Sequence, residues 1–123
     1  MAFGFYEASG GTFGQSEACG ARRVEIIVAS AFALGAGDMR DARRGCATVA
    51  FARQVAIYLS HTRLGLTYTE AGAYFGRDRT TAAYACRTVE DRRDDPAVDA
   101  AIDFLERAID VSRDLAIGRQ IHQ

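Results

Sequence analysis

The residues best suited to chemistry stand together as Arg77, Asp78, Arg79, Thr80 and Thr81. An arginine can donate two parallel hydrogen bonds to guanine, and the methyl group of threonine can contact that of thymine. An aspartate at this point can accept hydrogen bonds from the backbone N–H groups that begin a helix. The cluster therefore predicts a helix that begins near Asp78 and presents Arg and Thr side chains to the major groove of DNA.

Two short helices must position this cluster. Thr67 and Glu70 have the T-x-x-E spacing of a capping box, which predicts a first helix from Thr67 to about Phe75. Gly76 follows where the chain has to leave that helix. The second helix has an apolar stripe with spacings of three and four, made of Ala82, Ala85, Cys86 and Val89. The pattern is that of a helix-turn-helix; the alternative is two ordinary antiparallel helices whose polar face meets water.

Three runs of residues resemble one family. F-G-R-D-R-T-T-A-A-Y-A-C-R-T-V-E (75–90) resembles the signature F-G-G-R-D-H-T-T-V-x-H-A-C-R-K-I-E of the C-terminal DNA-binding domain of the bacterial replication initiator DnaA. A-R-Q-V-A-I-Y-L (52–59) and T-Y-T-E-A-G (67–72) resemble that family's [AP]-R-Q-[IV]-A-M-Y-L and S-L-P-E-I-G. The matches follow the family order and cover about residues 22–110. The resemblance implies an all-α fold, a compact bundle of about five helices that contains a helix-turn-helix and is TrpR-like.

The resemblance also implies a set of DNA-binding residues. They are Arg43, Arg44, Arg53, Gln54, Thr67, Arg77, Asp78, Arg79, Thr80, Thr81 and Arg87. Arg53 would contact a phosphate, and Thr80 would face the bases in the groove.

This chain departs from the family at four places. Gly45 falls where the family has an arginine that enters the minor groove, so Arg44 is expected to substitute for it, or the loop 38–48 is simply solvated. Arg79 replaces a histidine, Thr88 replaces a lysine, and one glycine is missing before Arg77.

The pattern predicts three further helices. The first runs from Ala21 to about Leu34, and its residues Ile26, Ile27, Ala29 and Phe32 are expected to pack beneath the DNA-binding unit. The second runs from Val49 to about Thr62. The last begins at Asp95-Pro96, a capping aspartate followed by proline at the first helical position.

The charged segments at the end of the chain are expected to meet solvent. The run E-D-R-R-D-D (90–95) is read as solvated, and His61 as a surface polar residue. The last helix is expected to bury a side marked by Val98, Ile102, Leu105, Ile109 and Ser112. Its acidic outer face would be repelled by phosphate and should lie away from DNA.

At 123 residues the chain is expected to form one domain over residues 19–118, with a flexible arm at 1–18 and a tail at 119–123. The arm mixes glycine with aromatic residues, and the alternative is that these aromatics dock on this or a neighbouring chain. A homodimer or a partner protein, held through the arm or the last helix, stays open.

The net charge of −1 hides a strongly uneven distribution. Residues 40–93 hold ten arginines and five carboxylates, a net charge of +5, whereas residues 94–123 hold three arginines and seven carboxylates, a net charge of −4. The positive part coincides with the motif, as duplex DNA requires.

Other classes of function fit poorly. The chain contains no lysine, so it has no P-loop for nucleotide, and neither histidine has a plausible nucleophile partner. The three cysteines lack metal-ligand spacing, and their odd number argues against a disulfide framework. No signal peptide or membrane span is seen, so we expect a cytoplasmic, nucleoid-associated protein that is not an enzyme and needs no cofactor or metal. Two hypotheses remain: a sequence-specific DNA-binding regulator, or an interaction module that keeps the fold without DNA binding.

Overall fold

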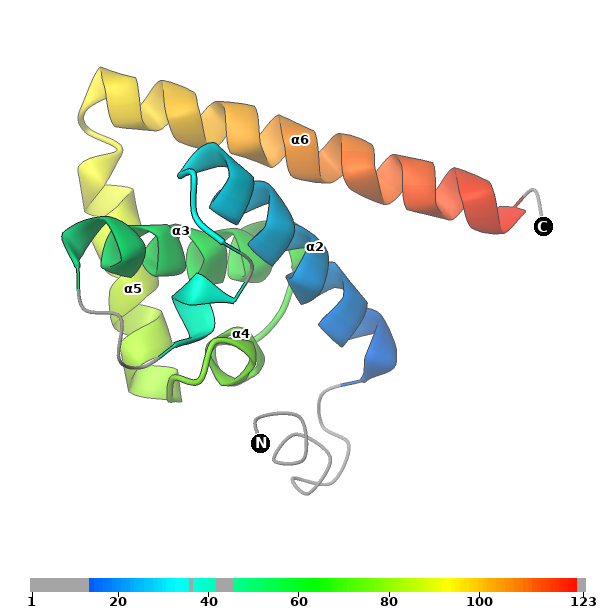
Figure 1. Ribbon diagram of the computed structural model, residues 1–123, viewed down its shortest axis with the longest axis horizontal. Helices are drawn as coiled ribbons and strands as arrows, with labels where there is room; N and C mark the ends of the chain where they lie inside the picture. Colours follow the sequence, from blue (N-terminus) through cyan, green and yellow to red (C-terminus); the bar gives the residue numbers. More distant parts are fainter. Residues whose placement is uncertain (1–13, 36, 42–45, 122–123) are drawn as a thin grey trace.

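The computed structural model describes residues 14–35, 37–41 and 46–121. Its elements are α2 (Gln15–Ala31), the 3-10 turn η1 (Asp38–Arg40), α3 (Ala47–Leu64), α4 (Tyr68–Tyr74), α5 (Arg79–Arg92) and α6 (Pro96–Ile121). Within these ranges every regular element is helical, which confirms the all-α class with five α-helices (Figure 1).

The centre of the bundle is α3. It contacts α2, α4, α5, α6 and η1, and the run of six residues from Val55 to Ser60 is buried on every side. The sequence pattern predicts only one core face for this helix, because periodicity does not show how many neighbours a helix has. The central position of α3 explains the difference.

The first helix differs from its expected boundaries. It begins at Gln15, inside the segment 1–18 for which an arm is expected, and it ends at Ala31 rather than near Leu34. Ala33 takes a left-handed backbone conformation with φ of 57°, so the chain turns before Gly35 is reached. The expected packing is confirmed for three of the four residues named: Ala29 is buried, and Ile27 and Phe32 pack against the core. Ile26 is the exception, since it is 47% exposed, and Val24 and Val28 are buried as well.

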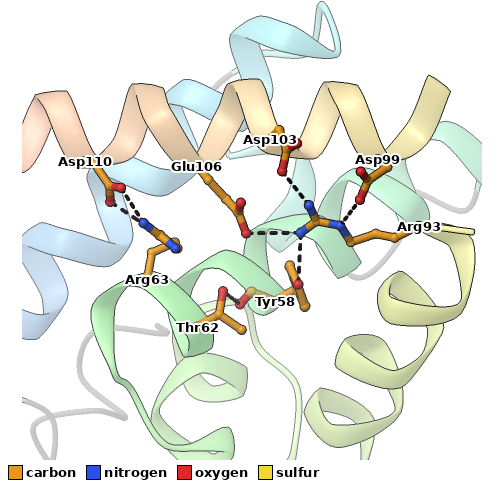
Figure 2. A network of polar contacts seen from close by, with 8 residues as sticks. All are labelled: Tyr58, Thr62, Arg63, Arg93, Asp99, Asp103, Glu106 and Asp110. Carbon is orange, nitrogen blue, oxygen red and sulfur yellow. Dashed lines mark hydrogen bonds and ion pairs between the residues drawn. The ribbon is translucent and has the colours of Figure 1, made fainter. Parts of the chain in front are cut away.

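The segment 90–95 is not simply solvated, and this corrects the expectation from sequence. The Arg93 side chain is 17% exposed and points from the end of α5 towards α6 (Figure 2). Its guanidinium donates to Asp99 at 2.6 Å, Asp103 at 2.6 Å, Glu106 at 3.1 Å and the hydroxyl of Tyr58 at 3.1 Å. Burial alone lowers the pKa of Arg93, but its hydrogen bonds to Asp99, Tyr58 and Glu106 outweigh that effect and raise it. This arginine therefore fastens α5, α6 and α3 together.

The acidic side of α6 consequently faces the bundle, where an outward direction was expected. Asp110, one helical turn beyond Glu106, pairs with Arg63 of α3 in the same row (Figure 2). The predicted buried side is confirmed at its centre, where Ile102, Leu105 and Ile109 are at most 4% exposed. The residues that turn outward are mainly apolar, since Phe104, Val111 and Leu115 are each more than half exposed.

The last helix and the helix-turn-helix lie on opposite sides of the bundle (Figure 1). In Figure 1, α6 runs along one edge, and α4 and the start of α5 lie at the opposite end of the bundle. α6 is fixed mainly to α2 and α3. None of the helices in the described part of the chain is both long and apolar enough to cross a lipid bilayer.

Candidate nucleic-acid interface

The start of α4 is fixed by the capping box that the sequence predicts. The hydroxyl of Thr67 accepts from the backbone N–H of Glu70 at 3.0 Å, and the Glu70 carboxylate accepts from the backbone N–H of Thr67 at 2.9 Å. Thr67 stays exposed while its backbone is held. The first helix of the motif therefore starts at a defined residue.

The turn between α4 and α5 is closed by backbone hydrogen bonds. Gly76 has φ of 71°, in the region that favours glycine. The N–H of Arg77 bonds to the carbonyl of Gly72 at 2.8 Å, and the N–H of Gly76 bonds to that of Ala73 at 3.1 Å. These two bonds form a Schellman motif, which fixes the angle at which the chain enters α5.

Gly72 is a structural residue that the sequence reasoning missed. A Cβ at this position would lie 2.8 Å from the carbonyl oxygen of Arg77 and 3.0 Å from that of Asp78. The backbone of the turn thus packs directly against α4. A glycine inside a short helix costs stability and signals such a close approach.

The first turn of α5 has the predicted form. The Asp78 carboxylate accepts from the backbone N–H of Thr81 at 2.8 Å, and this hydrogen bond lowers the pKa of Asp78. Arg79, Thr80 and Thr81 are exposed, while the predicted stripe of Ala82, Ala85, Cys86 and Val89 is buried. The helix therefore presents its Arg and Thr side chains to solvent from a rigid start.

A stacked pair of aromatic rings lies beside Arg79. The guanidinium carbon of Arg79 lies 6.0 Å from the centre of the Tyr68 ring, which is stacked on His61 at 4.3 Å. The Nδ1 atom of His61 is 2.7 Å from the carbonyl oxygen of Leu66. His61 is thus half-buried between α3 and α4, a correction to its assignment as a surface residue.

Arg87 also reaches this side of the molecule. It is exposed about two turns further along α5 than Arg79 and borders a hollow of about 280 Å³ that His61 and Tyr68 also line. Arg79 and Arg87 therefore flank the same aromatic pair.

Arg53 and Arg77 are brought together by the fold. Arg53 is half-buried in α3, and its Nε donates to the carbonyl oxygen of Met39 at 2.7 Å. Within the described ranges its buried Nη2 has no hydrogen-bond partner. Burial lowers the pKa of Arg53, and the nearby charge of Arg77 lowers it further. Two neighbouring cationic groups that repel each other favour the binding of an anion such as a phosphate between them.

Gln54 and the hydrogen bonds of Arg77 also belong to this corner. Gln54 is half-buried beside Arg53 on α3. Arg77 donates through Nη1 to the carbonyl oxygens of Phe75 and Gly76, both at 3.2 Å. Arg77 is therefore held against the turn itself.

A buried carboxylate, also missed by the sequence reasoning, holds this corner in place. Glu25 of α2 is 2% exposed and accepts from Arg40 Nε at 2.6 Å and from the hydroxyl of Tyr74 at 2.8 Å. Burial and this hydrogen bond raise the pKa of Tyr74 to about 12. The cluster joins α2, η1 and α4, and through η1 it positions the Met39 carbonyl that orients Arg53. A single glutamate on an apolar helix face is the only sign of it in the sequence.

The comparison with known families decides what this architecture is. The model of the bacterial DnaA protein helix-turn-helix matches residues 21–89, more than half of the chain. The chain belongs to this DnaA helix-turn-helix family.

Individual relatives agree with this result. The chromosomal replication initiator protein DnaA of Sphingopyxis alaskensis is 39% identical over 88 residues, which cover 70% of this chain and 19% of that protein. That of Treponema pallidum (strain Nichols) is 32% identical over 85 residues, which cover 68% and 18%. DnaA 2 of Chlamydia trachomatis is 37% identical over 65 residues, which cover 53% and 14%. The chain thus spans less than a fifth of each of these relatives, and no solved structure matches it.

The basic loop of this DnaA-type domain is only partly described. Arg43 and Arg44 lie outside the described residues, so the expected minor-groove contact stays a prediction. The flanks of the loop are anchored, since Met39 is buried and Val49 begins the buried side of α3.

The surface formed by α4 and the first turn of α5, which we call the reading end, carries arginines without paired carboxylates in the described part of the chain. Among the described residues, no carboxylate forms an ion pair with Arg53, Arg77, Arg79 or Arg87. The same ranges contain no cluster of side chains that could hold a metal ion. This surface offers hydrogen-bond donors and positive charge to a polyanion.

Proposed function

We propose that this chain is a sequence-specific double-stranded DNA-binding protein, a small regulator of transcription or replication, that reads the major groove with α5. The observation that carries the proposal is the first turn of α5. Its Arg and Thr side chains are exposed and have no acidic partner among the described residues, while the backbone of this turn is held by the Asp78 cap and the Schellman turn. A rigid helix start with open donors is what base readout requires.

The corner of Arg53 and Arg77 supports a second element of the proposal. Arg53 binds a phosphate on the flank of the groove, and this contact sets the position of α5 without reading sequence. Arg43 and Arg44 extend this contact into the adjacent minor groove. These roles rest on the family resemblance together with the geometry of Arg53.

The test is a fluorescence-anisotropy titration of mixed-sequence duplex at about 50 mM and at moderate salt. Each neutralised phosphate contributes a slope of about −0.9 in log K against log salt. Arg79→Met should weaken binding, and Arg113→Met, an exposed arginine on α6, should not. Absence of binding at low salt would refute the proposal and favour the alternative, an interaction module that keeps the fold without DNA binding.

Arg79 also predicts a change of target sequence. Family members have histidine here, whereas arginine is longer, always charged and best matched to the O6 and N7 atoms of guanine. A bidentate pair contributes about 1–3 kcal/mol of discrimination between bases. The affinity for a site with guanine at this position should therefore exceed the affinity for the initiator box by about tenfold or more. Selection from random duplexes with the parent protein and with Arg79→His measures this. Recovery of the initiator box by the parent protein would contradict it.

A further inference from the structure

The long last helix has three different faces. One is buried against α2 and α3 through Ile102, Leu105 and Ile109, and a second carries the carboxylates that hold Arg93 and Arg63 (Figure 2). The third turns away from the bundle. Its large side chains are Phe104, Val111 and Leu115, which are 62%, 56% and 61% exposed. A surface helix of a monomer normally has a polar outer face, so this one needs an explanation.

Six of the apolar residues on the outward side of α6 follow a heptad pattern. We call them the outer seam, and they are Ala97, Ala101, Phe104, Ala108, Val111 and Leu115. Their spacings alternate strictly between four and three over the length of α6, and Gly118 continues the series. Such spacing keeps one face of a helix against a second helix. An isolated exposed residue would not produce it.

Hollows beside the outer seam leave room for a second helix. One, of about 440 Å³, lies between α6, the end of α2 and α3, and is lined by Phe32, Phe51 and Phe104. The other, of about 460 Å³, lies further along α6 and is lined by Arg23, Val111 and Leu115. Together they run beside both halves of a helix about 39 Å long.

We infer that the outer seam is the contact between two copies of this chain, packed as an antiparallel pair of α6 helices. In that arrangement Phe104 lies against the partner's Leu115, and Ala108 lies against the partner's Val111. The two largest seam residues, Phe104 and Leu115, thus meet each other, and Ala101 meets the partner's Gly118. The same register brings Arg107 next to the partner's Asp114.

The charges beside the seam favour this antiparallel register. Arg107 and Asp114 are both exposed, and neither forms an ion pair within the described structure. In an antiparallel pair, positions that flank the seam on the same side of each helix face each other, so the Arg–Asp contact occurs twice around the two-fold axis. A parallel pair would leave both charges without this contact.

The position of the seam also determines how the two domains are oriented. With 3.6 residues per turn, the outer seam and the buried face of α6 are roughly 120° apart. A two-fold axis perpendicular to the plane of the helix pair therefore leaves both bundles on the same side of that plane. Because α4 and the start of α5 lie at the end of the bundle opposite α6 (Figure 1), both reading ends project to that side. Two half-sites related by two-fold symmetry match such a dimer.

The dimer is tested without DNA, by sedimentation equilibrium of the full chain over a wide range of concentrations. Leu115→Glu should raise the dissociation constant about a hundredfold, since each of two leucines loses its burial. The matched control is Ile117→Glu, which is on the same helix and 52% exposed but lies outside the seam. The control should dimerise like the parent, and circular dichroism should show the same helix content for all three proteins.

The charged pair tests the register. Arg107→Asp and Asp114→Arg should each raise the dissociation constant roughly threefold to tenfold, and the double variant should restore it. A parent chain that stays monomeric at every concentration would overturn the inference. So would a dimer that Leu115→Glu leaves intact, and a double variant no better than the single ones would overturn the antiparallel register. A chain that binds DNA as a monomer would contradict this inference and support the proposed function. A chain that dimerises but does not bind DNA would support this inference and contradict the proposed function.

Discussion

The two ends of this molecule use arginine in opposite ways. At the start of α5, Arg79 is exposed and has no carboxylate partner in the described structure, and it rests near an aromatic ring. Where α5 meets α6, Arg93 is largely buried and donates to three carboxylates and a tyrosine hydroxyl. The same side chain is available to an external anion in the first case and holds the fold together in the second.

The difference is set by the neighbours of each arginine. The segment that follows Arg93 is acidic, and α6 turns those carboxylates back onto the bundle. The segment that surrounds Arg79 supplies Asp78, whose carboxylate already accepts from the backbone of α5. Net charge along the sequence therefore indicates where positive charge is available, but the assignment of each arginine depends on which carboxylates the fold brings to it.

The largest expected effect is on stability, from Arg93→Met. Loss of this arginine leaves Asp99, Asp103 and Glu106 close together without a counter-charge, and we expect the free energy of unfolding to fall by about 2–3 kcal/mol. Urea unfolding followed by circular dichroism measures it. Arg79→Met, the matched variant at the other end, should change stability by no more than about 0.5 kcal/mol. Equal losses from the two variants would break the comparison.

A smaller effect is expected from Tyr74→Phe, in the buried cluster between the two ends. The variant removes one donor from buried Glu25 and should cost about 1–2 kcal/mol near neutral pH. The native pKa of Tyr74 is raised to about 12, above the ordinary value of about 10, so the parent protein loses this contribution as pH rises from about 10 through 12. Phenylalanine cannot ionise, so the variant should lose less stability over that range.

The control for this prediction is Tyr84→Phe, since Tyr84 is 59% exposed. It should change neither the stability at neutral pH nor the alkaline slope. Chemical denaturation at a series of pH values compares the three proteins. An alkaline slope that is the same in Tyr74→Phe as in the parent would contradict the role assigned to the cluster.

The smallest effect is expected from Arg63→Met, which tests whether burial separates the strong ion pair from the weak one. Arg63 and Asp110 are 36% and 38% exposed, so their pair should contribute at most about 1 kcal/mol. The contribution should also shrink as salt is added, because exposed charges are screened. Unfolding at low and high salt measures it. A loss as large as that of Arg93→Met would show that burial is not the deciding factor.

The sequence by itself determined the local structure of the reading end. The capping box of Thr67, the glycine exit at Gly76 and the Asp78 cap all depend on residues within five positions of one another, so their spacing is sufficient to predict them. The apolar stripe of α5 follows for the same reason. The motif resemblance gave the family, because it too depends on contiguous residues.

Only the tertiary structure decided the long-range partners. Glu25 and Tyr74 are 49 residues apart, and Arg63 and Asp110 are 47 apart, so no local pattern links them. The acidic residues of α6 were expected to face solvent because charge usually does. They instead face the bundle, because α6 packs with its carboxylates beside Arg93 and Arg63. Which face of an amphipathic helix meets water depends on the charges of the helices it packs against. The tertiary structure determines which helices these are.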